Sequence, residues 1–149
     1  MDRFLIRPFE ERDVLEVSNL EKECFSSPWS ESALRDELNN KNALFLVCLY
    51  ENRVVGYIGS IFVCDEMNIT NVAVLSDMRR KGIGENLIKT LIQQAKQKNI
   101  KEIFLEVRES NFSAQALYNK LGFVFLGKRR DFYSSPREDA ILMKYTIDG

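Results

Sequence analysis

Histidine is absent from this 149-residue chain. Without histidine the chain cannot build a Ser-His-Asp or Cys-His nucleophile system, nor any metal site with a histidine ligand. A general base must therefore be a carboxylate, an amine, a tyrosine or a water molecule. We expect no metal cofactor.

Cysteine is also scarce, since only Cys24, Cys48 and Cys64 occur, far apart and with no Cys-x-x-Cys pair. Cys48 and Cys64 lie inside apolar runs, which predicts that both are buried as small hydrophobic side chains. Because 45% of the residues are hydrophobic, the chain can bury a core without disulfides or metals.

Long apolar runs are missing too. None approaches the roughly 18 residues that a membrane helix requires, and the first residues lack the apolar core of a signal peptide. The formal net charge of −1 argues against a nucleic-acid-binding protein, whose surface would carry a basic patch. With no repeat or linker visible, we expect a single cytoplasmic domain over residues 1–149, without direct contact to nucleic acid or membrane. Basic residues at 79–81 and 128–130 still allow a phosphate-bearing ligand.

What the chain does contain is a succession of strand and helix patterns. Ser30 is a candidate N-cap for the second helix and Gly122 a candidate C-cap for the fourth. The predicted strands are 4–7, 43–50, 54–63, 68–75, 102–107, 123–126 and 140–145, and the predicted helices are 11–24, 30–38, 82–99 and a shorter one before Gly122. This order, β-α-α-β-β-β-α-β-α-β-β, predicts an α/β fold: a mixed sheet with helices on its faces.

The strongest chemical signal is the connection between strand 68–75 and the helix that begins at Gly82. Three cations, Arg79-Arg80-Lys81, precede Gly82 and Gly84. Amide groups at a helix N-terminus and the helix dipole favour an anion there, and glycine lets a ligand approach the backbone closely. A nucleoside-triphosphate or dinucleotide loop is excluded, because neither glycine pattern is complete: Leu87 stands where a third glycine would be. An ordinary connection with a solvated basic turn is the alternative.

A second signal is the alternating segment 103–108. Its odd-numbered residues are apolar and share one face, which leaves Glu106 and Arg108 on the other face. Because this strand is so apolar, we expect it near the centre of the sheet. Glu106 would then lie near the end of a largely buried element. Burial there would tune the carboxyl as a proton acceptor. A salt bridge to Arg108 or Lys101, or simple exposure, is the alternative.

The third region is the helix that follows. Ser110 or Asn111 is a natural N-cap for it. Tyr118 shares a face with Leu117 and Leu121, so it is either a core residue or a functional one, and a buried hydroxyl would need a partner.

Together these residues resemble the GCN5-related N-acetyltransferase family, whose Q/R-x-x-G-x-G/A motif reads here as Arg79-x-x-Gly82-x-Gly84. The resemblance extends over essentially the whole chain. It implies the acyl-CoA N-acyltransferase fold, with acetyl-CoA as cosubstrate and its pyrophosphate held by the amides of the turn. The coenzyme contacts that it implies come from Val72, Ala73, Val74, Arg79, Arg80, Lys81, Gly82, Ile83, Gly84, Glu85 and Asn111.

Within the family, segments 105–111, 116–118, 129–133 and 138–143 look like the bacterial ribosomal-protein-alanine N-acetyltransferases. This resemblance implies direct acetyl transfer to the α-amine of an N-terminal alanine, with Glu106 as proton acceptor and Tyr118 as proton donor. The implied partner is the N-terminal peptide of a small-subunit ribosomal protein, and the enzyme is expected to be a monomer or a weak homodimer. Phe132-Tyr133 departs from the two tyrosines that related enzymes often have at this place.

Two other functions are compatible with the sequence. One is acetylation of a small amine, such as a polyamine or an aminoglycoside, with the same coenzyme site. The other is a non-catalytic acyl-CoA-binding module, which would be favoured if Glu106 and Tyr118 lay far from the thioester.

Overall fold

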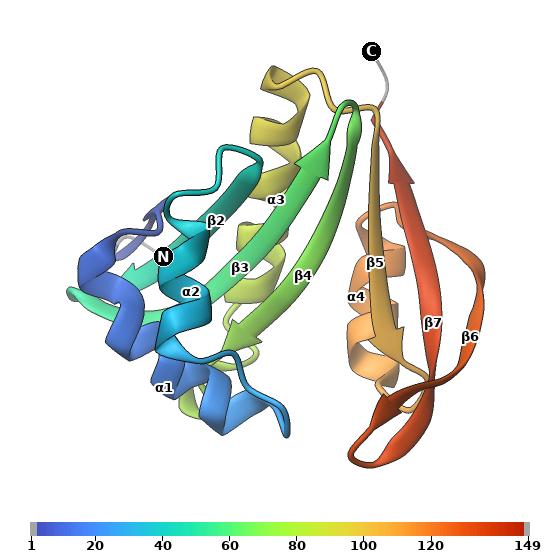
Figure 1. The fold of residues 1–149 in the computed structure, drawn as a ribbon, viewed down its shortest axis with the longest axis horizontal. Coiled ribbons are helices and arrows are strands. Elements are labelled where there is room, and N and C mark those ends of the chain that lie inside the picture. The colour runs from blue at the N-terminus through green and yellow to red at the C-terminus, as the bar shows by residue number, and fades with distance from the viewer. Residues whose placement is uncertain (1–2, 148–149) are drawn as a thin grey trace.

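A computed structural model describes residues 3–147 of the chain (Figure 1). The order of its strands and α-helices is the predicted one. The elements are β1 (Phe4–Pro8), α1 (Val14–Cys24), α2 (Glu31–Glu37), β2 (Ala43–Tyr50), β3 (Arg53–Val63), β4 (Glu66–Val74), α3 (Ile83–Gln97), β5 (Glu102–Arg108), α4 (Phe112–Lys120), β6 (Val124–Ser134) and β7 (Arg137–Thr146), with short 3-10 turns at Glu11–Asp13 and Ser76–Met78. The predicted α/β fold with a mixed sheet is confirmed.

The seven strands form one sheet in the order β1-β2-β3-β4-β5-β7-β6. Only the β4–β5 pair is parallel, and the other neighbours are antiparallel. Helices α1 and α2 lie on the front of the β2–β4 half, and α3 and α4 lie behind the sheet (Figure 1). Among residues 3–147, no helix therefore covers the front of the β5–β7 half.

Two hydrophobic cores follow from this layering. Behind the sheet, α3 buries a stripe at helical spacing, in which Leu87, Leu91 and Ala95 are fully enclosed against the strands. In front of it, Val17 and Leu20 of α1 pack with Leu34 of α2 over β2 and β3. Ser30 caps α2 as predicted, because its hydroxyl accepts a hydrogen bond from the amide of Ala33 at 3.0 Å.

The sheet divides between β4 and β5. These two strands pair over only three residues, from Glu66 opposite Glu102 to Asn68 opposite Phe104. A bulge follows at once, because Gly59 of β3 lies opposite Asn71 while its neighbour Ser60 lies opposite Ile69, so Thr70 is the extra residue. Beyond the bulge β4 and β5 diverge (Figure 1), and β4 keeps an edge without a partner strand.

Two predictions were wrong in detail. Cys48 is buried, but Cys64 is exposed in the β3–β4 turn, where it has a left-handed backbone (φ 55°). The apolar run before Cys64 leaves the core at the end of β3. The last hairpin is also longer than predicted, because β6 continues through the charged segment 128–131 to Ser134. None of the helices within residues 3–147 is long and apolar enough to cross a membrane.

Candidate active site

The open edge of β4 is the first component of the site. Leu75 donates its amide hydrogen to the carbonyl of Val55 on β3 at 2.9 Å. Because hydrogen bonding alternates along an antiparallel pair, the N–H and C=O groups of Val74 and Val72 face the opposite, open edge. Their side chains and that of Ala73 pack into the two cores. A ligand can therefore contact the backbone of Val72 and the N–H of Val74, whereas the carbonyl of Val74 already accepts a hydrogen bond from Arg79.

The α3 N-terminus is the second component. Gly82 precedes the helix in a left-handed conformation (φ 79°), which explains why glycine occupies this position. The first intrahelical bond runs from Asn86 N to Gly82 O, so the amides of Ile83, Gly84 and Glu85 have no intrahelical acceptor. Ile83 buries its side chain, and a Cβ at Gly84 would lie 3.9 Å from both Val74 and Leu117. The free amides thus lie where β4, α3 and α4 converge.

The three cations before Gly82 differ in their environment. Arg79 folds back onto β4, and its Nε donates to the carbonyl of Val74 at 3.2 Å. Its guanidinium also reaches Cys24 Sγ at 3.5 Å. Arg80 and Lys81 are exposed beside the helix N-terminus. These two residues can add positive charge for a phosphate group, whereas Arg79 mainly shapes the turn.

Glu85 and Asn111 both have structural partners. The Glu85 carboxylate bridges Lys89 at 2.9 Å and Lys120 of α4 at 3.0 Å, and these cations lower its pKa. Only the amide of Glu85 is therefore available to a ligand. Asn111 is the N-cap of α4, since its Oδ1 accepts from the amide of Ala114 at 3.2 Å. This resolves the choice between Ser110 and Asn111 as the cap.

Glu106 lies on the front face of β5 and is only partly buried, with 27% of its side chain exposed. The expected burial holds for its neighbours Leu105 and Val107 and not for Glu106 itself. Its ion-pair partner is Arg129 of β6 at 3.4 Å, and neither Arg108 nor Lys101. Sequence reasoning missed Arg129, because β7 separates β5 from β6 in the sheet and no local spacing reveals such a contact.

Tyr118 of α4 is 9% exposed and packs against Phe123 with the two rings tilted, with 5.6 Å between ring centroids. Burial, followed by the influence of Tyr133, raises the pKa of Tyr118 to about 12. Among residues 3–147 its hydroxyl finds no hydrogen-bond partner, so its proton is not committed elsewhere in the fold.

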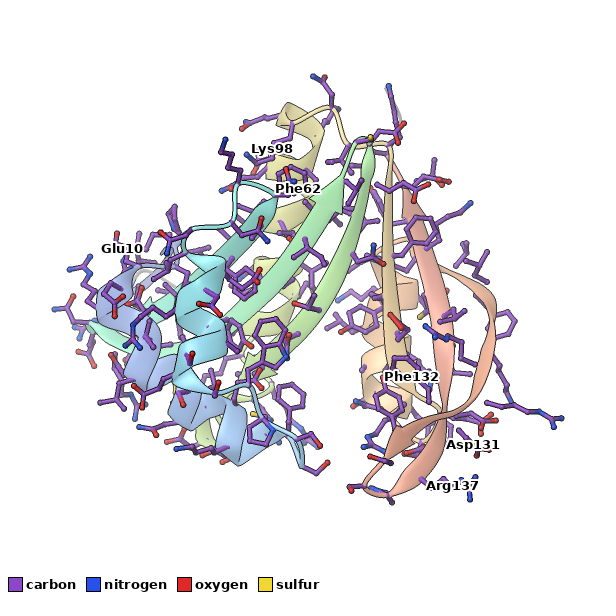
Figure 2. All side chains as sticks on the ribbon, in the orientation of Figure 1. Glu10, Phe62, Lys98, Asp131, Phe132 and Arg137 are labelled. Atoms are coloured by element: carbon purple, nitrogen blue, oxygen red, sulfur yellow. The ribbon has the colours of Figure 1, made fainter. Side chains whose placement is uncertain are left out.

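Tyr133 connects these two residues electrostatically. Its own pKa is raised by burial and then by the charge of Glu106. Tyr133 in turn raises the pKa of Tyr118, after the larger effect of burial. Phe132 and Tyr133 meet edge to face at 5.0 Å in a β6 bulge, near the end of the hairpin that Figure 2 marks with Asp131 and Arg137.

A pocket of about 270 Å³ is lined by residues of β4, β5, β6 and β7, beside the stretch where β4 and β5 pair. Glu106 and Arg129 line it together with Asn68 at the end of the β4–β5 pairing. Asn68 was not singled out from the sequence, because nothing in its neighbourhood distinguishes it from an exposed strand residue. The other residues that line the pocket are Glu66, Phe104, Leu105, Leu126, Leu142 and Met143.

A cationic helix N-terminus, an open strand edge and a carboxylate beside a pocket therefore lie in sequence along one side of β4. This is the arrangement expected of a transferase that takes a group from an extended, phosphate-bearing donor and passes it to an acceptor bound near the carboxylate.

Comparison of this chain with known proteins supports the same class of enzyme. The profile of the acetyltransferase (GNAT) family matches residues 14–123. The [ribosomal protein bS18]-alanine N-acetyltransferase of Haemophilus influenzae is 33% identical over 142 residues, which cover 93% of this chain and 96% of that protein. The Escherichia coli K12 protein of the same name is 31% identical over 144 residues, with 95% and 97% covered.

Solved structures give the same result. The crystal structure of the ribosomal-protein-S18-alanine N-acetyltransferase from Escherichia coli superposes with a TM-score of 0.89 at 30% identity, covering 98% of this chain and 96% of that one. Ard1 from Thermoplasma volcanium gives 0.90 at 25% identity, with 99% of each chain covered. The chain therefore belongs to the acetyltransferase (GNAT) family, and the prediction of an N-acetyltransferase is confirmed.

Proposed function

We propose that this protein transfers the acetyl group of acetyl-CoA to the α-amine of an N-terminal alanine, and that its acceptor is the N-terminus of a ribosomal protein of the bS18 type. The observation that carries the proposal is the continuity of the site, from the free α3 amides along the open β4 edge to the pocket at Glu106. The names and near-complete coverage of the relatives support the same acceptor.

The residues fit acetyl-CoA as the acyl donor. The amides of Ile83, Gly84 and Glu85, with Arg80 and Lys81 beside them, would hold the pyrophosphate. The backbone of Val72 and Val74 would bind the pantetheine arm as a strand binds its neighbour. No side chain crowds Gly82, because a Cβ there would meet no atom within 4 Å. The turn is thus open on its ligand side.

The acceptor amine must lose a proton before it can attack. An α-amino group has a pKa of about 7.7–8.0, so most of it is protonated at neutral pH. Glu106 would accept that proton, directly or through a water molecule. The amine nitrogen then forms a bond to the thioester carbonyl carbon, and the free N–H of Val74 would stabilise the oxyanion.

Collapse of that intermediate breaks the C–S bond and releases the coenzyme A thiolate. Tyr118 would give its proton to this sulfur, and its raised pKa ensures that the hydroxyl is protonated at neutral pH. The nitrogen loses its second proton as the amide forms, and this proton restores the tyrosine hydroxyl, directly or through water. No acetyl-enzyme forms on this route, and the chain contains no histidine to activate a cysteine for one.

The test is mass spectrometry of an Ala-Arg-Tyr-Phe-type N-terminal peptide incubated with acetyl-CoA and the protein. We expect one acetyl group on the α-amine, and none on a peptide whose alanine amine is blocked in advance. A panel of polyamines and aminoglycosides runs in parallel. Acetylation of a small amine without acetylation of the peptide would contradict the proposed acceptor, and coenzyme binding without any acetyl transfer would contradict the reaction.

A further inference from the structure

Arg108 contacts several parts of the chain close in sequence and in the sheet to Glu106. It lies two residues after Glu106 on the same face of β5. Its guanidinium donates to the carbonyls of Pro136 at 2.9 Å and Ser135 at 3.2 Å, both in the β6–β7 turn. It also pairs with Glu138 of β7 at 3.1 Å. One side chain of β5 thus holds the end of the last hairpin.

The same guanidinium lies over the ring of Tyr133, at 4.3 Å from the ring centroid. Tyr133 belongs to β6, the strand whose Arg129 pairs with Glu106 at 3.4 Å. Arg108 therefore determines where Tyr133 lies relative to the two proposed catalytic residues. The planar guanidinium can stack on the ring and still donate in its own plane to the turn, which a lysine ammonium cannot do.

The carbonyl of Ser135 has a second donor. Ser26, in the connection between α1 and α2, donates its hydroxyl to this oxygen at 2.7 Å. A carbonyl oxygen can accept two hydrogen bonds, so Ser135 joins Arg108 of β5 to the α1–α2 connection. This bridge spans the two halves of the sheet at the end where β4 and β5 have separated.

Glu138 extends the clamp toward α4. Its Oε2 accepts from the amide of Ser110 at 2.5 Å while its Oε1 pairs with Arg108, and these contacts lower its pKa. The segment that leads into the α4 N-cap is therefore attached to the same cluster. Arg108, Glu138, Ser135 and Ser26, which we call the hairpin clamp, link four elements around Glu106.

We propose that Arg108 is a positioning residue for the acceptor. Through the hairpin clamp it fixes the β6–β7 turn and Tyr133 against Glu106, and it holds the α1–α2 connection in place on the opposite side of the site. This inference rests on the proposed function, in which Glu106 receives the acceptor amine. Arg108 itself takes no part in the chemical steps.

The test compares steady-state kinetics of five variants on the N-terminal alanine peptide. Arg108→Gln should raise the KM for the peptide at least tenfold and leave the KM for acetyl-CoA within twofold. Arg108→Lys should recover less than half of that loss, because one ammonium cannot make the fork and the stack together. Arg137→Gln is the matched control, since Arg137 lies in the same hairpin and, within residues 3–147, pairs only with Asp131. This variant should leave both KM values unchanged.

Ser26→Ala and the double variant with Arg108→Gln test the shared carbonyl. If both donors act through Ser135, their effects on the KM for the peptide are not additive. The KM of the double variant should then be at most about twofold higher than that of Arg108→Gln. Additive losses, or an unchanged peptide KM in Arg108→Gln, would overturn the proposal. So would equal increases of both KM values, which a general loss of structure would produce.

A readout independent of activity separates this proposal from the proposed function. Trp29 is the single tryptophan of the chain and lies in the α1–α2 connection. Release of the hairpin clamp in Arg108→Gln or Ser26→Ala should increase acrylamide quenching of its fluorescence, while Arg137→Gln should not. If the wild-type protein fails to acetylate the peptide, the proposed function fails and this measurement still decides the clamp. Unchanged quenching in both clamp variants would refute it.

Discussion

Replacing Glu106 with glutamine tests the proposed chemistry most directly, because the change removes a proton acceptor and almost no volume. A positioned general base contributes roughly 10²- to 10⁴-fold to a rate, so kcat at pH 7 should fall by that factor. Stability should change little. The ion pair of Glu106 with Arg129 is partly exposed, with 27% and 57% of the two side chains accessible, and such pairs contribute about 0–1 kcal/mol.

The pH dependence of the rate of the Glu106→Gln variant can also be predicted. With an acceptor pKa of about 7.7–8.0, only roughly a tenth to a sixth of the amine is free at pH 7, against more than nine tenths at pH 9. Without its base, the Glu106→Gln variant depends on this free fraction. Its rate should therefore rise about six- to tenfold between pH 7 and pH 9.

The assay follows release of the coenzyme A thiol, with acetylation of the peptide confirmed by mass spectrometry. Glu102→Gln is the matched control: Glu102 lies on the same face of β5, is paired with Lys144 at 3.0 Å and is not one of the residues that line the pocket. The reasoning is refuted if Glu106→Gln keeps more than a third of the wild-type kcat at pH 7. An equal loss in Glu102→Gln would show that the effect comes from the strand and its ion pairs.

Three further changes test other parts of the site and fold. Tyr118→Phe should lower kcat about 10²-fold. It should not lower the melting temperature, since the hydroxyl makes no hydrogen bond to the rest of residues 3–147. In the wild-type protein kcat should stay constant up to pH 10, given a Tyr118 pKa of about 12. Gly82→Ala should cost about 1–2 kcal/mol in urea denaturation, because φ is 79°, and should raise the KM for acetyl-CoA more than that for the peptide. Glu21→Gln tests the buried carboxyl that Tyr57 and Asn71 contact. Burial raises the pKa of Glu21 above 4.5, so the folded state binds the carboxyl proton more tightly than the unfolded state does. The protonated carboxyl therefore contributes its full stability below pH 4.5, and this contribution is lost as pH rises through the folded-state pKa. The stability difference between variant and wild type should therefore move in favour of the glutamine as pH rises from 4 to 8, and a constant difference would count against this account.

The elements that could be predicted from the sequence are those whose burial is one-sided and regular. In α3 the apolar residues recur every three or four positions, and the structure buries Leu87, Leu91 and Ala95 accordingly. In β5 the alternation of apolar and polar residues matches the observed pattern of buried and partly buried positions. A single periodic face was sufficient in both cases to predict the element and the direction of its side chains.

The second half of β6 could not be predicted on that basis. It is an edge strand, and its residues from Lys128 to Phe132 are exposed on both faces or lie in a bulge. Without a buried face there is no selection for alternation, so the charged segment reads as a loop. The same reason hides the contact of Arg129 with Glu106, because β7 lies between β6 and β5 in the sheet.

The separation of β4 from β5 explains why the proposed site needs residues that no single motif contains. Three paired residues hold the strands together at one end, and the bulge at Thr70 turns β4 away at the other. This leaves the amides of Val72 and Val74 free for a donor, but it also leaves the two halves of the sheet without a common hydrogen-bond ladder at the place where the reaction would occur. Side chains must then supply the connection, and Arg108 with Ser26 supplies it through the carbonyl of Ser135. The gap between β4 and β5 admits the donor, and the hairpin clamp holds the acceptor side of the site in a fixed position relative to the donor. Variants of the hairpin clamp should therefore raise the KM for the peptide more than the KM for acetyl-CoA.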